Sequence, residues 1–228
     1  MMMKTELAAR IISILTALAA LQPTVAGDAL KTKILYQNNF EKSAVGAVPE
    51  DFLVLDGAFK VQQEVFDKNN KFLELPGAPL DTYGVLFGPT EKEGIAVSAR
   101  IFGTSKGRRF PTFAVGLNGV GGYRLQVSPG KKLIELFKGD NLMTSIPYEW
   151  PSGTWTHLRL EIKKADNEGW NVLGKVWIAG EAEPAKPILS AKEKEEPVAG
   201  RSSIWGSPFA GTPIRYDDLT VTHISGKP

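Results

Sequence analysis

Two adjacent carboxylates stand at the start of the alternating segment that closes the chain, in the stretch RYDDLTVTHI at residues 215–224. Such a pair could act as a general acid and base, bind a metal ion, or only end a turn. Strict alternation would place Asp217 and Asp218 on opposite faces of an extended strand. We therefore expect that these two residues alone do not form the carboxyl pair, roughly 5–9.5 Å apart, that a glycosidase needs.

Further polar side chains alternate with apolar ones along the central segments of the chain. They are Arg100, Arg124, Gln126, His157, Arg159 and Glu161. If their strands are neighbours in one sheet, these side chains form a polar patch that could bind an acidic sugar. The alternative is an ordinary solvated sheet face with cross-strand ion pairs.

Three of the five tryptophans, Trp150, Trp170 and Trp205, stand in turns or near loop edges. There an indole could stack on the apolar face of a sugar ring, or fasten a loop to the core. The other two, Trp155 and Trp177, lie inside alternating segments, where packing is the simpler expectation. A basic loop at residues 104–110, TSKGRRF, could meet anionic glycans or phosphate lipids, or be a solvated turn.

The elements that must position these residues are strands, because the dominant pattern from residue 33 onward is alternation separated by glycine-rich turns. In Ile95–Phe102, apolar residues stand at every second position, and the same holds in FAVGLN, GYRLQVS and TWTHLRLEIK. The pattern predicts an all-β chain of roughly a dozen strands in a two-sheet antiparallel sandwich or jelly roll. We expect a solvated loop over residues 181–200, with a short helix through SAKEKEE as the alternative.

The first 26 residues have the features of an export signal. Lys4 and Arg10 precede an eleven-residue apolar run, and small residues lead to a cleavage site after Ala26. That run is too short to span a bilayer, and no later run is apolar enough. We expect an exported protein (periplasmic, cell-surface or extracellular) with one domain over residues 27–228 and no transmembrane segment.

Composition excludes several functions. The formal net charge is only +2, whereas nucleic-acid binding usually requires a strong excess of basic residues on one face. The chain has no cysteine and only two histidines, so thiol chemistry, disulfides and a cysteine- or histidine-rich metal site are excluded or disfavoured.

Many weak elements occur in an order that resembles the concanavalin A-like lectin and glucanase jelly-roll superfamily, in its laminin-G-like, bacterial secreted branch. The elements are NNFEKSAVGAVPEDFLVLDGAFKV, the central FAVGLNGVGGYRLQVSPGKKLIELFKGD, WPSGTWTHLRLEIKK, GKVWIAGE and the closing SSIWGSPFAGTPIRYDDLTVTHI. The resemblance covers about Ile34 to Ile224 and implies the fold. It is unspecific for function, since such folds serve lectins, enzymes and adhesion domains.

The resemblance also implies a candidate calcium site, because related jelly rolls hold a structural calcium between their first and last strands. Here that site would use Glu41 and Asp218. The three-carboxylate string Glu-x-Asp-x-x-Glu of the glucanase branch is absent. The leading interpretation is non-catalytic carbohydrate or glycan binding through Arg100, Arg124, Gln126, His157, Arg159, Trp150, Trp170 and Trp205. The alternatives are a polysaccharide-degrading glycosidase or lyase, and a structural or adhesive envelope module.

Overall fold

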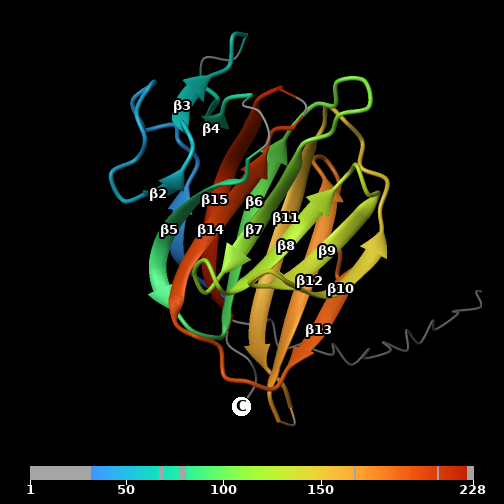
Figure 1. Ribbon diagram of the computed structural model, residues 1–228. Coiled ribbons are helices and arrows are strands. Elements are labelled where there is room, and N and C mark those ends of the chain that lie inside the picture. The colour runs from blue at the N-terminus through green and yellow to red at the C-terminus, as the bar shows by residue number, and fades with distance from the viewer. Residues whose placement is uncertain (1–31, 67–68, 78–80, 167, 210, 225–228) are drawn as a thin grey trace, which may run out of the picture.

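The computed structural model describes residues 32–224 except 67–68, 78–80, 167 and 210, and Figure 1 shows them as two packed sheets. The expected export signal, residues 1–26, lies outside the described residues. No helix that is long and apolar enough to cross a membrane occurs in the described part of the chain.

Both sheets are antiparallel. The eight-stranded sheet has the order β13 (Leu189–Glu193), β12 (Trp170–Ile178), β11 (Trp155–Lys164), β6 (Ile95–Phe102), β15 (Ile214–Ile224), β4 (Lys71–Leu75) and β3 (Lys60–Gln63), with β1 (Thr32–Asn38) also paired to β15. The seven-stranded sheet has the order β10 (Asn141–Pro147), β9 (Leu133–Lys138), β8 (Tyr123–Ser128), β7 (Thr112–Leu117), β14 (Gly200–Ser207), β5 (Tyr83–Glu91) and β2 (Leu53–Asp56). The expected all-β, two-sheet antiparallel sandwich is confirmed.

The alternation in the sequence translates directly into burial. In β11, Thr156, Leu158, Leu160 and Ile162 are buried, while the residues between them stay partly exposed. The inward side chains of β6, β7 and β8 complete one continuous core between the sheets. Polar residues between the buried positions therefore point away from the core, on whichever outer face their sheet presents.

The loop expected at residues 181–200 contains a strand instead. β13 pairs antiparallel with β12 and forms one edge of the eight-stranded sheet. Leu189 is buried there, while the remaining side chains of the strand are partly or fully exposed. The charged composition that suggested a loop is that of a protected sheet edge, where charges discourage pairing with other chains.

A β-bulge in β15 corrects the expected placement of the two aspartates. The pairing of β15 with β6 shifts between Asp217 and Thr220, and Asp218 has a left-handed φ of 51°. The extra residue changes the phase of the alternation. Ile214 and Tyr216 face the core before the bulge, and Leu219 and Val221 face it after the bulge. As a result, both carboxylates reach the outer face and neither turns into the core.

Candidate functional site

The predicted polar patch is divided between two opposite faces of the molecule. Arg100, His157 and Arg159 lie on β6 and β11 of the eight-stranded sheet, whereas Arg124 and Gln126 lie on β8 of the seven-stranded sheet. β6 and β11 are neighbours, with His157 opposite Arg100, but β8 lies in the other layer. The sequence correctly predicted that these side chains point outward, but a single binding patch does not form.

On the eight-stranded sheet, each outward arginine has carboxylate partners. Arg159 binds Glu161, with 2.6 Å between Nε and Oε1. Arg215 lies 2.9 Å from Glu64. His157 stacks on Trp177 at 4.9 Å with an interplanar angle of 7°, and burial lowers its pKa. The outer face of the eight-stranded sheet is therefore a surface of ion-paired side chains, as in the alternative to a sugar-binding patch.

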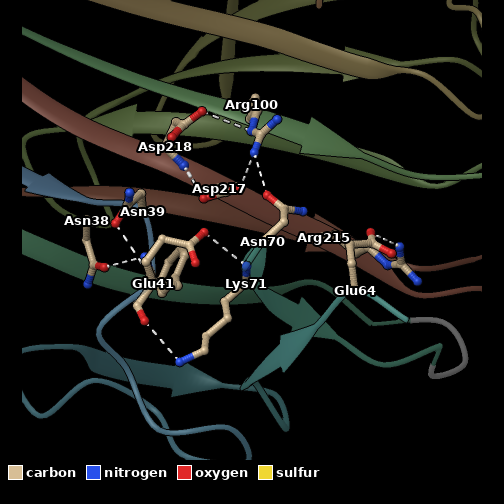
Figure 2. A network of polar contacts seen from close by, with 11 residues as sticks. Asn38, Asn39, Glu41, Glu64, Asn70, Lys71, Arg100, Arg215, Asp217 and Asp218 are labelled. Carbon is tan, nitrogen blue, oxygen red and sulfur yellow. Dashed lines mark hydrogen bonds and ion pairs between the residues drawn. The ribbon is translucent and has the colours of Figure 1, made fainter. Parts of the chain in front are cut away.

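Asp217 and Asp218 both bind Arg100, as Figure 2 shows. Arg100 Nη2 lies 2.5 Å from Asp217 Oδ2, and Arg100 Nε lies 2.9 Å from Asp218 Oδ2. The same Nη2 also donates a hydrogen bond to Asn70 Oδ1 at 3.1 Å. Asp217 is only 1% exposed, and this burial raises its pKa to about 6, although Arg100 acts in the opposite direction. The adjacent carboxylates thus anchor an arginine at the bulge.

The two candidate calcium ligands already have protein partners. β1 and β15 pair as expected, so Glu41 and Asp218 lie in the same region (Figure 2). Glu41 Oε1 accepts the Lys71 backbone N–H at 3.1 Å, and the Lys71 ammonium binds the Glu41 carbonyl at 3.0 Å. Within the described ranges, no group of three or more acidic or histidine side chains is placed to hold a metal ion. With Arg100 and Lys71 bound to them, these residues do not fit a calcium site.

A groove of about 870 Å³ opens on the other outer face, at one end of the seven-stranded sheet. Its floor is formed by β7, β8 and β14, and its rim by the loops that follow β4, β6, β8 and β14. Its lining residues are Gly77, Thr82, Arg108, Arg109, Phe110, Thr112, Arg124, Gln126, Ser128, Gly130, Lys131, Ser207, Phe209 and Gly211. Two predicted site residues, Arg124 and Gln126, and the basic loop therefore meet in one groove.

A row of residues crosses the sheet beside this groove. Trp205 on β14 pairs with Ala114 on β7, which pairs with Gln126 on β8, and Gln126 pairs with Glu135 on β9. These side chains share the outer face, since the intervening residues of each strand face the core. Trp205 therefore lies next to the groove, two residues before the lining residue Ser207 on β14, with its ring centroid 5.9 Å from the guanidinium of Arg124.

The indole of Trp205 lies flat against the sheet because two glycines leave room for it. A Cβ on Gly84 would stand 2.6 Å from the indole ring, and a Cβ on Gly116 would stand 3.3 Å from Nε1. Nε1 also donates a hydrogen bond to Ser203 Oγ at 2.8 Å. The ring is held as a partly exposed apolar platform, of the kind on which a sugar ring can stack.

Glu135, on β9 beside the groove, is buried by its neighbours and held as an anion. Its carboxylate accepts hydrogen bonds from Ser128 Oγ at 2.5 Å, Gln126 Nε2 at 3.3 Å and Lys131 Nζ at 3.0 Å. Burial acts to raise the pKa of Glu135, but these donors outweigh burial and hold the pKa below its usual value. The carboxylate positions the Gln126 amide and is unsuited to donating a proton.

The other two candidate tryptophans are placed differently. Trp150 is buried among core residues, packs edge-on against Phe113 at 5.6 Å and donates to Thr156 Oγ1 at 3.1 Å. It therefore fastens its turn to the core and presents no stacking surface. Trp170 opens β12 on the eight-stranded sheet, and its Nε1 donates to Glu93, so it lies away from the groove.

Sequence reasoning missed the part that Lys131 and the hydroxyl groups play in the groove. Lys131 lies in the turn between β8 and β9 and belongs to no motif. Thr82, in the loop before β5, and Ser207, at the end of β14, are far apart in the sequence, yet their hydroxyl oxygens meet at 2.7 Å. In the sequence, the only indication that hydroxyl groups line the groove was the outward position of Thr112 and Ser207 in their strands. Which loops share one end of the sandwich depends on strand order, which alternation does not encode.

Comparison with known proteins shows the fold. The sequence matches no known protein family and no curated protein. Among solved structures, a protein of unknown function with a galectin-like fold from Bacillus subtilis is 14% identical, with a TM-score of 0.58, covering 85% of this chain and 97% of that one. The VIP36 exoplasmic/lumenal domain, solved with Ca2+ and Man3GlcNAc, is 6% identical, with a TM-score of 0.57 and coverage of 80% and 87%.

A third match is the carbohydrate-binding module CBM66 from Bacillus subtilis, which is 12% identical with a TM-score of 0.50 and coverage of 75% and 94%. The chain therefore has the concanavalin A-like, galectin-like sandwich fold, a fold shared by lectins, carbohydrate-binding modules and glycoside hydrolases.

Proposed function

We propose that this protein is an exported, non-catalytic carbohydrate-binding sandwich whose binding site is the groove on the outer face of the seven-stranded sheet. The observation that carries the proposal is the groove itself, which brings together an amide, hydroxyls and arginines and lies next to the indole of Trp205. Sugars bind to such surfaces through stacking on aromatic rings and hydrogen bonds from pre-positioned polar groups. Structures of this fold include a carbohydrate-binding module and glycoside hydrolases, so the choice between binding and hydrolysis rests on the groove.

The groove argues against hydrolysis. Its described lining residues include no carboxylate, and a glycosidase needs two carboxyl groups facing one cleft. Glu135 lies beside the groove and contacts three of its lining residues, but its lowered pKa keeps it ionised, so it cannot serve as the general acid. His157, the histidine among the predicted site residues, lies on the opposite sheet and cannot act as a base in this groove.

Export is proposed from the N-terminal pattern of residues 1–26 alone. We expect the protein secreted from its native host to begin at Gly27, which N-terminal sequencing of the purified product measures. A product that retains residue 1 would contradict export through this signal.

The experiment for binding is titration calorimetry and thermal unfolding with a panel of soluble polysaccharides, for the native protein and for Trp205→Ala. A ligand raises the melting temperature because it binds only the folded state. We expect Trp205→Ala to weaken binding at least tenfold, since truncating a central aromatic residue typically costs about 2 kcal/mol. The matched control is Trp177→Ala, which removes a partly exposed tryptophan from the opposite sheet.

Each remaining outcome identifies an alternative. Release of reducing ends or unsaturated products would establish a polysaccharide-degrading enzyme in place of a binding module. Equal loss of binding in Trp205→Ala and Trp177→Ala would place the site elsewhere. Absence of binding to every polysaccharide would favour a structural or adhesive module.

A further inference from the structure

Positive charge gathers around the groove although the chain as a whole is almost neutral. Arg108, Arg109, Arg124 and Lys131 line it, whereas the formal net charge of the full chain is only +2. Lys131 is paired with Glu135 beside the groove. The local excess therefore comes from the three arginines.

These arginines have no carboxylate partners. None of the ion pairs formed among the described residues includes Arg108, Arg109 or Arg124. The outward arginines of the opposite sheet behave differently: Arg100 and Arg215 each contact two carboxylates. Among the described residues, the arginines that line the groove thus lack carboxylate partners, whereas the outward arginines of the eight-stranded sheet have them.

Arg124 is the most confined of the three. Its guanidinium lies over the rings of Phe137, at 5.0 Å, and Trp205, at 5.9 Å, and its Nε is buried without a hydrogen-bond partner. Burial is the main influence on its pKa and lowers it, with Asp140 and Glu135 opposing. A partly desolvated guanidinium with free donors is costly to leave unpaired, and an anionic group is the partner that matches its geometry.

The remaining lining distinguishes between possible anions. Thr82, Thr112, Ser128 and Ser207 supply hydroxyls, and Phe110 and Phe209 supply apolar surface. A string of sugar rings uses hydroxyls, apolar surface and the flat indole of Trp205 together, along the sheet. A lipid phosphate could use the cations and hydroxyls, but it has no sugar ring to stack on the indole of Trp205.

We propose that the groove binds an acidic polysaccharide, whose carboxylate or sulfate substituent pairs with Arg124 while its sugar rings extend toward Trp205. The inference rests on the proposed function and adds the ligand class. Arg108 and Arg109 on the rim contribute longer-range attraction, which salt screens more readily than the contact at Arg124.

The experiment compares ligands that differ only in charge. Calorimetry measures binding of the full protein to polygalacturonate and its methyl-esterified form, to heparin and desulfated heparin, and to phosphatidylglycerol vesicles. We expect binding to polygalacturonate or heparin, at least tenfold weaker binding to the uncharged counterpart, and marked weakening when salt rises from about 50 mM to about 500 mM.

Variants connect this selectivity to the residues. Arg124→Gln should weaken binding of the charged ligand roughly tenfold or more and should reduce the difference in affinity between the charged and uncharged ligands. The double variant Arg108→Gln/Arg109→Gln lies on an exposed loop and tests the charge independently if Arg124→Gln fails to fold; it should flatten the salt dependence. Lys60→Gln, an exposed residue on the opposite sheet, is the control for a loss of positive charge.

The outcomes separate the two proposals. Equal binding of charged and uncharged ligands, unaffected by Arg124→Gln, would overturn the acidic-ligand inference and leave carbohydrate binding intact. Binding to the vesicles but to no saccharide would overturn both proposals in favour of a membrane surface. No binding to any probe, charged or neutral, would likewise overturn both.

Discussion

Removing the guanidinium of Arg100 should destabilise the fold in a pH-dependent manner. Asp217 is 1% exposed and bound to Arg100, so Arg100→Gln leaves a buried carboxylate without its counterion. Breaking a buried pair in this way costs about 3–5 kcal/mol near neutral pH. At acid pH, Asp217 can take up a proton and the cost falls to about 1 kcal/mol, the size of the lost contact with Asn70.

The sign follows from the pKa of Asp217. Burial raises this pKa from 3.8 to about 6, so the folded state binds the proton more tightly than the unfolded state. For this group, stability is greatest below about pH 4 and declines by up to about 3 kcal/mol as pH rises to about 6. Without Arg100, which opposes the rise, the pKa increases further and the decline continues to higher pH.

The assay is urea unfolding at about pH 5, 6 and 7.5 for the native protein and for Arg100→Gln. The variant Arg100→Gln/Asp217→Asn is the matched control, because it removes both charges and should recover most of the loss at pH 7.5. A loss that is equal at all three pH values, or a double variant no more stable than Arg100→Gln, would refute an ion pair that stabilises through Asp217.

Other predictions concern the groove and the core. Glu135→Gln should cost about 1–2 kcal/mol at pH 7 in urea unfolding; because the pKa of Glu135 is lowered on folding, this difference should vanish as pH falls below about 4, and its persistence there would contradict the ionised state. Gly206→Ala should lower Tm strongly, since a Cβ there would stand 2.1 Å from the Tyr216 hydroxyl, whereas Gly121→Ala, with open space, should leave Tm nearly unchanged; similar Tm values would refute this packing. Calcium should not raise Tm relative to EDTA, and a rise abolished by Asp218→Ala would instead establish a metal at the bulge.

The sequence was sufficient to predict the fold and the direction of most side chains, because alternation reports burial directly. The buried and outward positions of β11 and β8 followed from it. The pairing of the first and last strands was expected from related jelly rolls and not from alternation. Alternation could not show which sheet a strand belongs to. Arg100 and Arg124 both alternate with apolar residues, yet they lie on opposite faces of the molecule.

The remaining differences arise from single residues whose neighbours are distant in sequence. Asp218 adopts a left-handed conformation that aspartate tolerates but does not require, so no local pattern predicts the bulge. Trp150 stands in a turn and is buried only because Phe113 and Thr156 come together around it. Arg108 and Arg109 were recognised as a basic loop, but their place beside Arg124 depends on the packing of four loops.

The pairing of β1 with β15 also determines how this sandwich could be carried by another body. Thr32 pairs with Ile224, so the polypeptide enters and leaves the described sandwich side by side (Figure 1). β15 begins just after the groove rim at Gly211 and runs eleven residues to Ile224, a length of roughly 35 Å at 3.3 Å per residue. Anything tethered at either end would therefore sit at the far pole from the groove, leaving the groove directed outward. The same adjacency makes the sandwich suited to circular permutation, with a short linker closing the old ends and new ones opened in a loop remote from the groove.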